Sequence, residues 1–156
     1  MNNFLDFSGK TALVTGAAGA IGRSVAGGLA QCGARVFVTD LHPHGVEATL
    51  AELTKSGFDA AGLAADVTNE AQVKAVVGAA AERFHSRIDI LVNVAGVAGQ
   101  NPIEDITEQE WDFVFAANCK GTFFFIKHVV PLMKARKHGK IVNYASKSGK
   151  TGSALC

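Results

Sequence analysis

Several residue types that mark specialised proteins are scarce in this sequence of 156 residues. There are only three cysteines, Cys32, Cys119 and Cys156, an odd number at spacings that suit neither a zinc site nor a disulfide framework. No run of Lys or Arg forms a phosphate-binding stripe, and the 15 basic residues nearly balance the 14 acidic ones. We therefore expect no metal site and no nucleic-acid partner.

Long hydrophobic runs are also missing. The most apolar stretch, residues 123–133, is interrupted by Lys127, His128 and Pro131, so we expect no membrane span. The N-terminus lacks the pattern of a signal peptide, and with so few cysteines this favours a cytoplasmic protein. The 48% hydrophobic content is enough for a sizeable core, and residues 1–156 are expected to form one domain.

Strand-like apolar runs alternate with helix-like segments along the chain. Strands are predicted at 10–15, 35–40, 58–66, 88–93 and 140–145, and the last helix is predicted to run from a capping box at Thr107 and Glu110 to about Lys137. This alternation predicts an α/β fold, a doubly wound parallel sheet with helices on both faces.

The first strand runs into the glycine-rich stretch TGAAGAIG at 15–22. Gly16 would allow a tight turn, Gly19 and its small neighbours would leave room for close approach, and Gly22 would let the following helix pack on the strand. Such a turn can place the first helical N–H groups against a phosphate. Taken alone, it is equally consistent with a close-packed strand–helix corner.

Asp40 ends the second strand, eighteen residues after Gly22, where a carboxylate can accept hydrogen bonds from an adenosine ribose. A helix-capping or solvated acid is the alternative. Beside a ribose, Asp40 would repel a 2′-phosphate about 4 Å away by roughly 4 kcal/mol at an effective dielectric near 20, roughly a thousandfold in affinity. No Arg or Lys occupies Ala17, Leu41 or His42, so NAD is favoured over NADP.

Five motifs together resemble the short-chain dehydrogenase/reductase (SDR) family. They are TGAAGAIG at 15–22, DV at 66–67, NVAG at 93–96, NCKG at 118–121 and IVNYAS at 141–146. The resemblance covers essentially the whole chain and implies a Rossmann-like fold with strand order 3-2-1-4-5. In that order strand five would be an apolar edge, as if later strands were missing. The resemblance also implies an oxidoreductase that transfers hydride between NAD and a small-molecule secondary alcohol or ketone.

The resemblance implies a role for each matched residue. It assigns cofactor binding to Gly16, Gly19, Ile21 and Gly22 at the pyrophosphate, Asp40 at the ribose, Asp66 and Val67 at the adenine, and Asn93, Ala95 and Gly96 beside the fourth strand. Asn118 would hold a proton-relay water at a helix kink, and Ser146 would hydrogen-bond the substrate oxygen. The family's usual second Asn is replaced by Val94.

The family's catalytic Tyr-x-x-x-Lys pair is absent from this sequence. The single tyrosine, Tyr144, lies in the fifth predicted strand and is followed four residues later by Ser148 instead of Lys, so we reject it as a substitute. A phenol with a pKa near 10 needs a neighbouring cation for acid–base work near neutral pH. We therefore expect the chain alone to be inactive and to be the front part of a longer protein.

Two other functions remain open at this stage. One is a non-catalytic dinucleotide-binding module, and the other is an NADPH-dependent 3-oxoacyl reductase. The resemblance also implies a homotetramer that pairs its long helices. The sequence is consistent with this, because five phenylalanines give the long helix apolar surface on more than one side: Phe113, Phe115, Phe123, Phe124 and Phe125.

Overall fold

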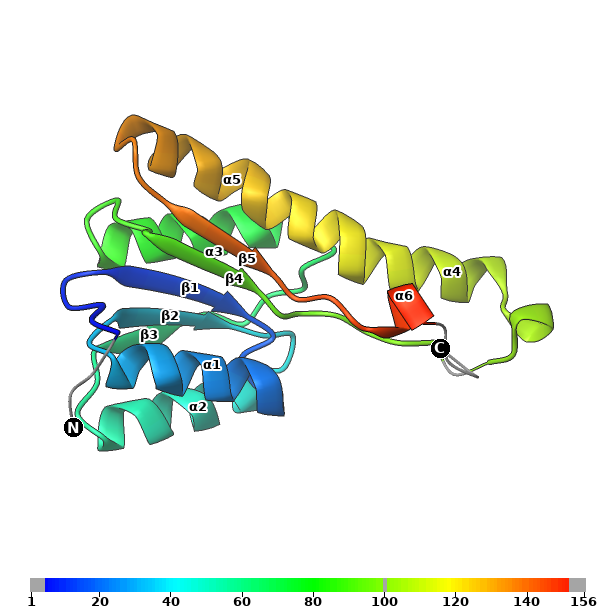
Figure 1. The fold of residues 1–156 in the computed structure, drawn as a ribbon, viewed down its shortest axis with the longest axis horizontal. Helices are drawn as coiled ribbons and strands as arrows, with labels where there is room; N and C mark the ends of the chain where they lie inside the picture. The colour runs from blue at the N-terminus through cyan, green and yellow to red at the C-terminus, as the bar shows by residue number, and fades with distance from the viewer. Residues whose placement is uncertain (1–4, 100, 152–156) are drawn as a thin grey trace.

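The computed structural model describes residues 5–99 and 101–151, in which strands and helices alternate (Figure 1). The strands are β1 (Thr11–Thr15), β2 (Arg35–Thr39), β3 (Ala60–Gly62), β4 (Ile90–Asn93) and β5 (Lys140–Asn143). The helices are α1 (Ala20–Gln31), α2 (Pro43–Lys55), α3 (Glu70–Arg83), α4 (Glu108–Phe115), α5 (Thr122–Ala135) and α6 (Ser148–Thr151). A 3-10 turn, η1 (Ile103–Asp105), precedes α4, and a π-helical segment, η2 (Ala116–Gly121), joins α4 to α5.

All five strands are parallel and lie in the order β3-β2-β1-β4-β5, which confirms the predicted topology. Leu13 in the central strand pairs with Phe37 of β2 on one side and with Leu91 of β4 on the other. Because the strands are parallel, their carboxyl ends meet at one edge of the sheet, where ligands of open α/β folds bind.

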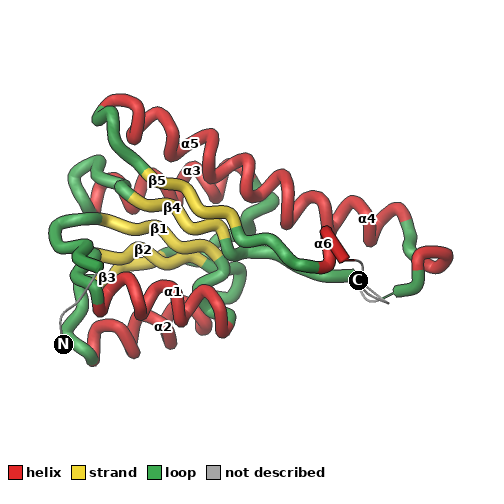
Figure 2. The backbone as a smooth tube through the Cα atoms, viewed as in Figure 1, coloured by secondary structure: helices red, strands yellow, loops and turns green. Residues whose placement is uncertain are grey.

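Helices cover both faces of the sheet, and each face has its own core (Figure 2). Leu13, Phe37 and Leu91 point to the face covered by α3 and α5. Their neighbours one position along the strands, such as Val14 and Val92, point to the face covered by α1 and α2. This alternation explains why the strands read as continuous apolar runs.

Several predicted bounds were too long. The third strand, predicted over 58–66, pairs with β2 only at Ala60–Gly62. Beyond it, the Leu63 amide still donates to the Val38 carbonyl. The long helix contains the π segment, and it stops at Ala135, two residues before Lys137, which has a positive φ of 52°. The hydroxyl of Thr107 caps α4 as predicted, but Glu110 accepts from the Asn101 side chain instead of completing the box.

The continuous helical segment Glu108–Ala135 is long and apolar enough to cross a membrane by length and composition alone, which the interrupted sequence did not lead us to expect. Much of its apolar character has a role within the fold, because Phe125, Val129 and Met133 of α5 are buried against the sheet and α3. The segment is by itself weak support for a membrane span.

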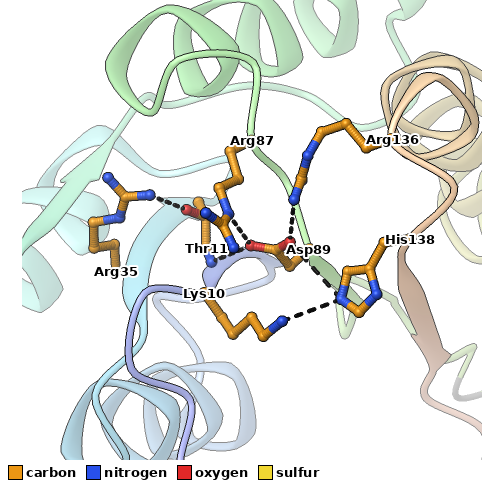
Figure 3. A network of polar contacts seen from close by, with 7 residues as sticks. All are labelled: Lys10, Thr11, Arg35, Arg87, Asp89, Arg136 and His138. Carbon is orange, nitrogen blue, oxygen red and sulfur yellow. Dashed lines mark hydrogen bonds and ion pairs between the residues drawn. The ribbon is translucent and has the colours of Figure 1, made fainter.

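At the opposite, amino edge of the sheet, the buried carboxylate of Asp89 ties several elements together (Figure 3). It accepts from the Thr11 amide at 2.9 Å, from Arg87 at 3.1 Å and from Arg136 at 2.9 Å. Burial alone raises the pKa of Asp89, but the Thr11 amide and the two guanidinium groups outweigh it and lower that pKa below its ordinary value. Asp89 is therefore a structural anion remote from the carboxyl edge.

An apolar groove crosses β4 and β5 on the α1 side of the sheet. Phe7, Val25, Leu29, Ile90, Val92, Val142 and Tyr144 line it, with Lys10, Asp89, His138 and Lys140 at its polar end. Val142 and Tyr144 are about half exposed. The prediction that strand five is an apolar edge is thus confirmed.

Candidate cofactor-binding site

A cavity of about 570 Å³ opens at the carboxyl edge of the sheet. Of the predicted cofactor residues, nine line it: Gly16, Gly19, Ile21, Gly22, Asp40, Asp66, Val67, Ala95 and Gly96. Strand ends and loops that are distant in sequence thus meet at one site. Among the described residues that line the cavity there is no Lys or Arg.

The turn between β1 and α1 requires two of its glycines. Gly16 has a φ of +64°, and a Cβ there would lie 2.7 Å from the Ala95 amide nitrogen. A Cβ at Gly22 would clash with the carbonyl of Gly16. The first glycine thus lets the turn pass close to the loop after β4, and the third lets α1 pack on the turn.

Helix α1 begins at the wall of this cavity without a side-chain cap. Its N-cap is Gly19, and the first turn contains no acidic residue. The leading amides of a helix carry partial positive charge and lack acceptors within the helix. Ala20, Ile21 and Gly22, which supply those amides, all line the cavity, so the arrangement can receive an anion.

The Asp40 carboxylate lies at the same cavity, immediately after β2. One oxygen, Oδ2, accepts from the Ala18 amide at 3.0 Å, and the other, Oδ1, accepts from the His42 amide at 3.2 Å. Each carboxylate oxygen can accept more than one hydrogen bond. Asp40 is therefore oriented by the backbone and retains acceptor capacity toward the cavity.

Asp66 and Val67 form another part of the wall, after β3. Asp66 Oδ1 accepts from both the amide and the hydroxyl of Thr68, at 2.8 and 2.7 Å, so this carboxylate stabilises its own turn. The side chain of Val67 also packs against the end of the π segment η2, since a Cβ at Gly121 would lie 2.8 Å from Val67 Cγ2.

The loop after β4 is attached to β1 by Thr15, a residue for which the sequence analysis predicts no role. The buried hydroxyl of Thr15 accepts from the amides of Val94 and Ala95, both at 3.0 Å. Asn93 does not line the cavity; it is buried and donates to the Asn143 side chain of β5 at 2.9 Å. This matches the alternative structural role for Asn93, which is to tie adjacent strands together.

Asn118 lies in the π-helical segment and holds the same loop from the other side. Its amide group makes two hydrogen bonds with the backbone of Val97, accepting from the nitrogen at 2.7 Å and donating to the oxygen at 2.8 Å. Its own carbonyl accepts from the Thr122 hydroxyl at 2.9 Å. The predicted irregularity at Asn118 is thus a π-helical insertion that docks on the loop after β4.

Ser146 follows β5 at the carboxyl edge and is exposed, but it does not line the cavity as far as the described residues define it. Tyr144 lies in the apolar groove on the α1 side. Cys32 and Cys119 are free, whereas Cys156 is outside the described residues. Within residues 5–99 and 101–151 no group of His, Cys, Asp or Glu could hold a metal ion.

The glycine turn after β1, the acid at the end of β2 and the parallel strand order are typical of a Rossmann-type fold. A sequence model of the short chain dehydrogenase family matches residues 10–156, and the chain belongs to that family.

Curated relatives include an uncharacterized oxidoreductase from Bacillus subtilis, 41% identical over 93% of this chain. Others are the D-threitol dehydrogenase of Mycolicibacterium smegmatis, 44% identical over 90% of the chain, and the sorbitol dehydrogenase of Cereibacter sphaeroides, 42% identical over 94%. The chain covers only 56%, 54% and 56% of these proteins, so it spans about half their length.

Solved structures share the fold. A variant of the actinorhodin polyketide ketoreductase with NADPH superposes with a TM-score of 0.90 at 37% identity, covering 94% of this chain and 56% of that one. A structure named as a putative short-chain alcohol dehydrogenase from Sinorhizobium meliloti gives a TM-score of 0.90 at 39% identity, covering 96% of this chain and 59% of that one. The Rossmann-like prediction is therefore confirmed.

Proposed function

We propose that this chain binds NAD and supplies the cofactor-binding part of an oxidoreductase that interconverts a secondary alcohol and its ketone. One observation carries the proposal: the uncapped N-terminus of α1 and the Asp40 carboxylate face a single cavity. A diphosphate needs backbone donors, and a ribose diol needs an acceptor. The two groups provide both at one site.

The space in the turn fits a dinucleotide. A Cβ built on Gly19 would have only the Gly16 carbonyl within 4 Å, at 3.4 Å, so the rest of a side chain there would occupy the cavity. Gly19 therefore keeps the entrance to the helix N-terminus clear. Ala20 beside it is also small and exposed, which leaves the backbone approachable.

Charge in the cavity supports NAD over NADP. Asp40 is held in place by two backbone amides, and no described Lys or Arg of the wall would neutralise a 2′-phosphate. Two like charges in a partly buried site repel by several kcal/mol. The carboxylate would accept from the ribose hydroxyls and disfavour the phosphorylated cofactor.

When bound, NAD supplies the hydride-transfer chemistry at its nicotinamide ring. In this proposal Ser146 hydrogen-bonds the substrate oxygen. Asn118 holds the loop after β4 against the π segment through its hydrogen bonds to Val97. The sequence contains neither a Tyr-x-x-x-Lys pair nor a second tyrosine. The 156-residue chain would therefore bind the cofactor without turnover. Because relatives are named as threitol, sorbitol and galactitol dehydrogenases, polyols are the first substrates to test with any longer form.

An NADPH-dependent ketoacyl reductase is the second candidate. It is favoured by the polyketide ketoreductase structure with NADPH and by a putative ketoacyl reductase of Streptomyces violaceoruber at 40% identity. That function requires the 2′-phosphate to be tolerated beside Asp40. The relative affinities for NAD and NADP decide between the candidates.

We also infer that the protein self-associates through α4 and α5, as a tetramer in the full assembly. Trp111, Phe113, Phe115 and Phe123 are each about half exposed on these helices, and the Trp111 and Phe115 rings stack at 4.4 Å. Phe125, by contrast, belongs to the core. Exposed aromatic patches of this kind are typical of association surfaces.

Amide NMR spectra recorded during an NAD titration test the binding proposal. Shifts should concentrate at the amides of Ala20, Ile21, Gly22 and Asp40. The amide of Lys10, at the amino edge, serves as an internal control and should not move. Saturable shifts confined to other regions, or none at all, would contradict the proposed site.

A further inference from the structure

The peptide group that joins Ala17 to Ala18 is fixed at both of its polar ends. Its carbonyl oxygen accepts from the Thr49 hydroxyl of α2 at 3.0 Å, and its N–H donates to Asp40 Oδ2 at 3.0 Å. The oxygen and the N–H of a trans peptide point in opposite directions. One peptide group therefore spans the distance between a helix side chain and the carboxylate of the cavity.

Thr49 is a fully buried polar residue of α2. Its single hydroxyl proton is shared between the carbonyls of Ala17 and Gly45, each at 3.0 Å. Helix α2 also lies close to the turn, because a Cβ at Gly45 would clash with the Ala18 side chain. Because Gly45 has no side chain and Thr49 is buried, α2 contacts the turn directly.

The next peptide group is held in a similar way. The Ala18 carbonyl accepts from Arg23 at 3.2 Å, and the same guanidinium pairs with Glu52 of α2 at 3.0 Å. The turn is thus attached to α2 directly at the Ala17 carbonyl and indirectly, through Arg23 of α1, at the Ala18 carbonyl.

We propose that Thr49 is a positioning residue for cofactor selection, acting on Asp40 through the Ala17–Ala18 peptide. This inference rests on the proposed NAD site and adds a specificity determinant that does not itself line the cavity. With the hydroxyl present, the peptide holds its N–H toward Asp40, and the carboxylate keeps one orientation. Without it, the peptide can rotate, Asp40 loses a fixed donor, and discrimination between a ribose hydroxyl and a 2′-phosphate falls.

The test measures Kd for NAD and for NADP on the full 156-residue chain and its variants. Thr49→Val replaces the hydroxyl by a methyl group of similar size. It should weaken NAD binding by about three- to tenfold, as expected for one lost hydrogen bond. It should also lower the ratio of the NADP Kd to the NAD Kd. Thr49→Ser retains the hydroxyl and should restore the ratio.

Thr54→Val is the matched control, because Thr54 makes the same kind of bond within α2, to the Leu50 carbonyl at 2.8 Å, far from the turn. It should leave the ratio unchanged. In an Asp40→Asn background, Thr49→Val should no longer alter the ratio, which a purely structural role would not predict. A ratio equal in Thr49→Val and Thr54→Val would overturn the inference while leaving the NAD site intact, and wild-type protein that does not bind NAD would overturn both.

A second measurement needs no variant and covers the case in which Thr49→Val does not fold. Hydrogen exchange of the Ala18 amide in the wild type should be at least about tenfold slower than that of Ala20, whose amide begins the uncapped helix. Equal rates would show that the peptide is not held, and the inference would fail.

Discussion

The Ala18 amide nitrogen lies 3.0 Å from Asp40 Oδ2, which joins the glycine turn after β1 to the acid at the end of β2. Asp40 and the glycines of the turn line the cavity, where in the proposed function they would meet the ribose and the pyrophosphate. The hydrogen bond means that the two proposed recognition elements are directly connected. Substitutions in either part should therefore affect the other.

Replacing Asp40 by Asn should shift cofactor preference. The amide oxygen can still accept from Ala18, which retains the turn, while the hydrogen bond from the His42 amide is lost. The negative charge that would repel a 2′-phosphate is removed. The ratio of NADP to NAD Kd values should fall by at least about tenfold, as measured by titration calorimetry. Asp59→Asn, at an exposed ion pair with Arg83, is the control, and an unchanged ratio at Asp40 would refute its assignment.

Replacing each of two glycines of α1 by alanine should change the free energy of unfolding in opposite directions. Gly22→Ala forces a Cβ against the Gly16 carbonyl and should destabilise the fold by about 1–3 kcal/mol while abolishing NAD binding. Gly28→Ala has nothing within 4 Å of the new Cβ, so it should stabilise the helix by about 0.5–1 kcal/mol. Urea unfolding followed by circular dichroism measures both, and equal effects would show that the turn is not tightly packed.

The Asp89 network predicts a pH-dependent stability. The pKa of Asp89 is lowered in the folded protein, so its contribution is complete above the unfolded pKa of about 4 and is lost as pH falls through the lower folded value. Asp89→Asn should cost about 2–3 kcal/mol at pH 7, because it removes a buried, hydrogen-bonded charge.

The difference in free energy of unfolding between the wild type and Asp89→Asn should shrink below about pH 4. Urea unfolding of the two proteins at several pH values measures it. Asp59→Asn should cost less than about 1 kcal/mol at pH 7, since its ion pair is exposed. A difference at Asp89 that does not vary with pH would contradict the ionised role.

The aromatic surface on α4 and α5 should control association. Replacing Phe113 and Phe123 together by Ser should lower the molar mass seen by light scattering, and it should change the free energy of unfolding of the dissociated protein by only about 0.5 kcal/mol at each site. Leu63→Ser, at another exposed apolar residue, should leave the mass unaltered. A wild-type protein that is monomeric at high concentration would exclude this surface as an interface.

Much of the fold follows from local sequence patterns. Apolar runs predicted the number of the strands, and the three glycines predicted the tight turn between β1 and α1, because both depend on residues close together in the chain. The third strand was overestimated since its residues 63–66 continue beyond the ladder with β2, a limit that depends on the partner strand.

Contacts between distant residues were not predictable in the same way. The Thr49 hydroxyl reaches the Ala17 carbonyl across 32 positions, and the Thr15 hydroxyl reaches the Ala95 amide across 80. Nothing in the spacing of these threonines marks them as site residues. Similarly, Glu110 satisfied a capping pattern, yet its carboxylate bonds Asn101, because the folded loop offers a competing donor.

Calorimetric titration of NAD and NADP into the purified 156-residue chain tests the central claim most directly. Saturable binding of one NAD per chain, with NADP bound at least about tenfold more weakly, is the predicted result. Failure of a folded chain to bind NAD, or tighter binding of NADP, would contradict the account.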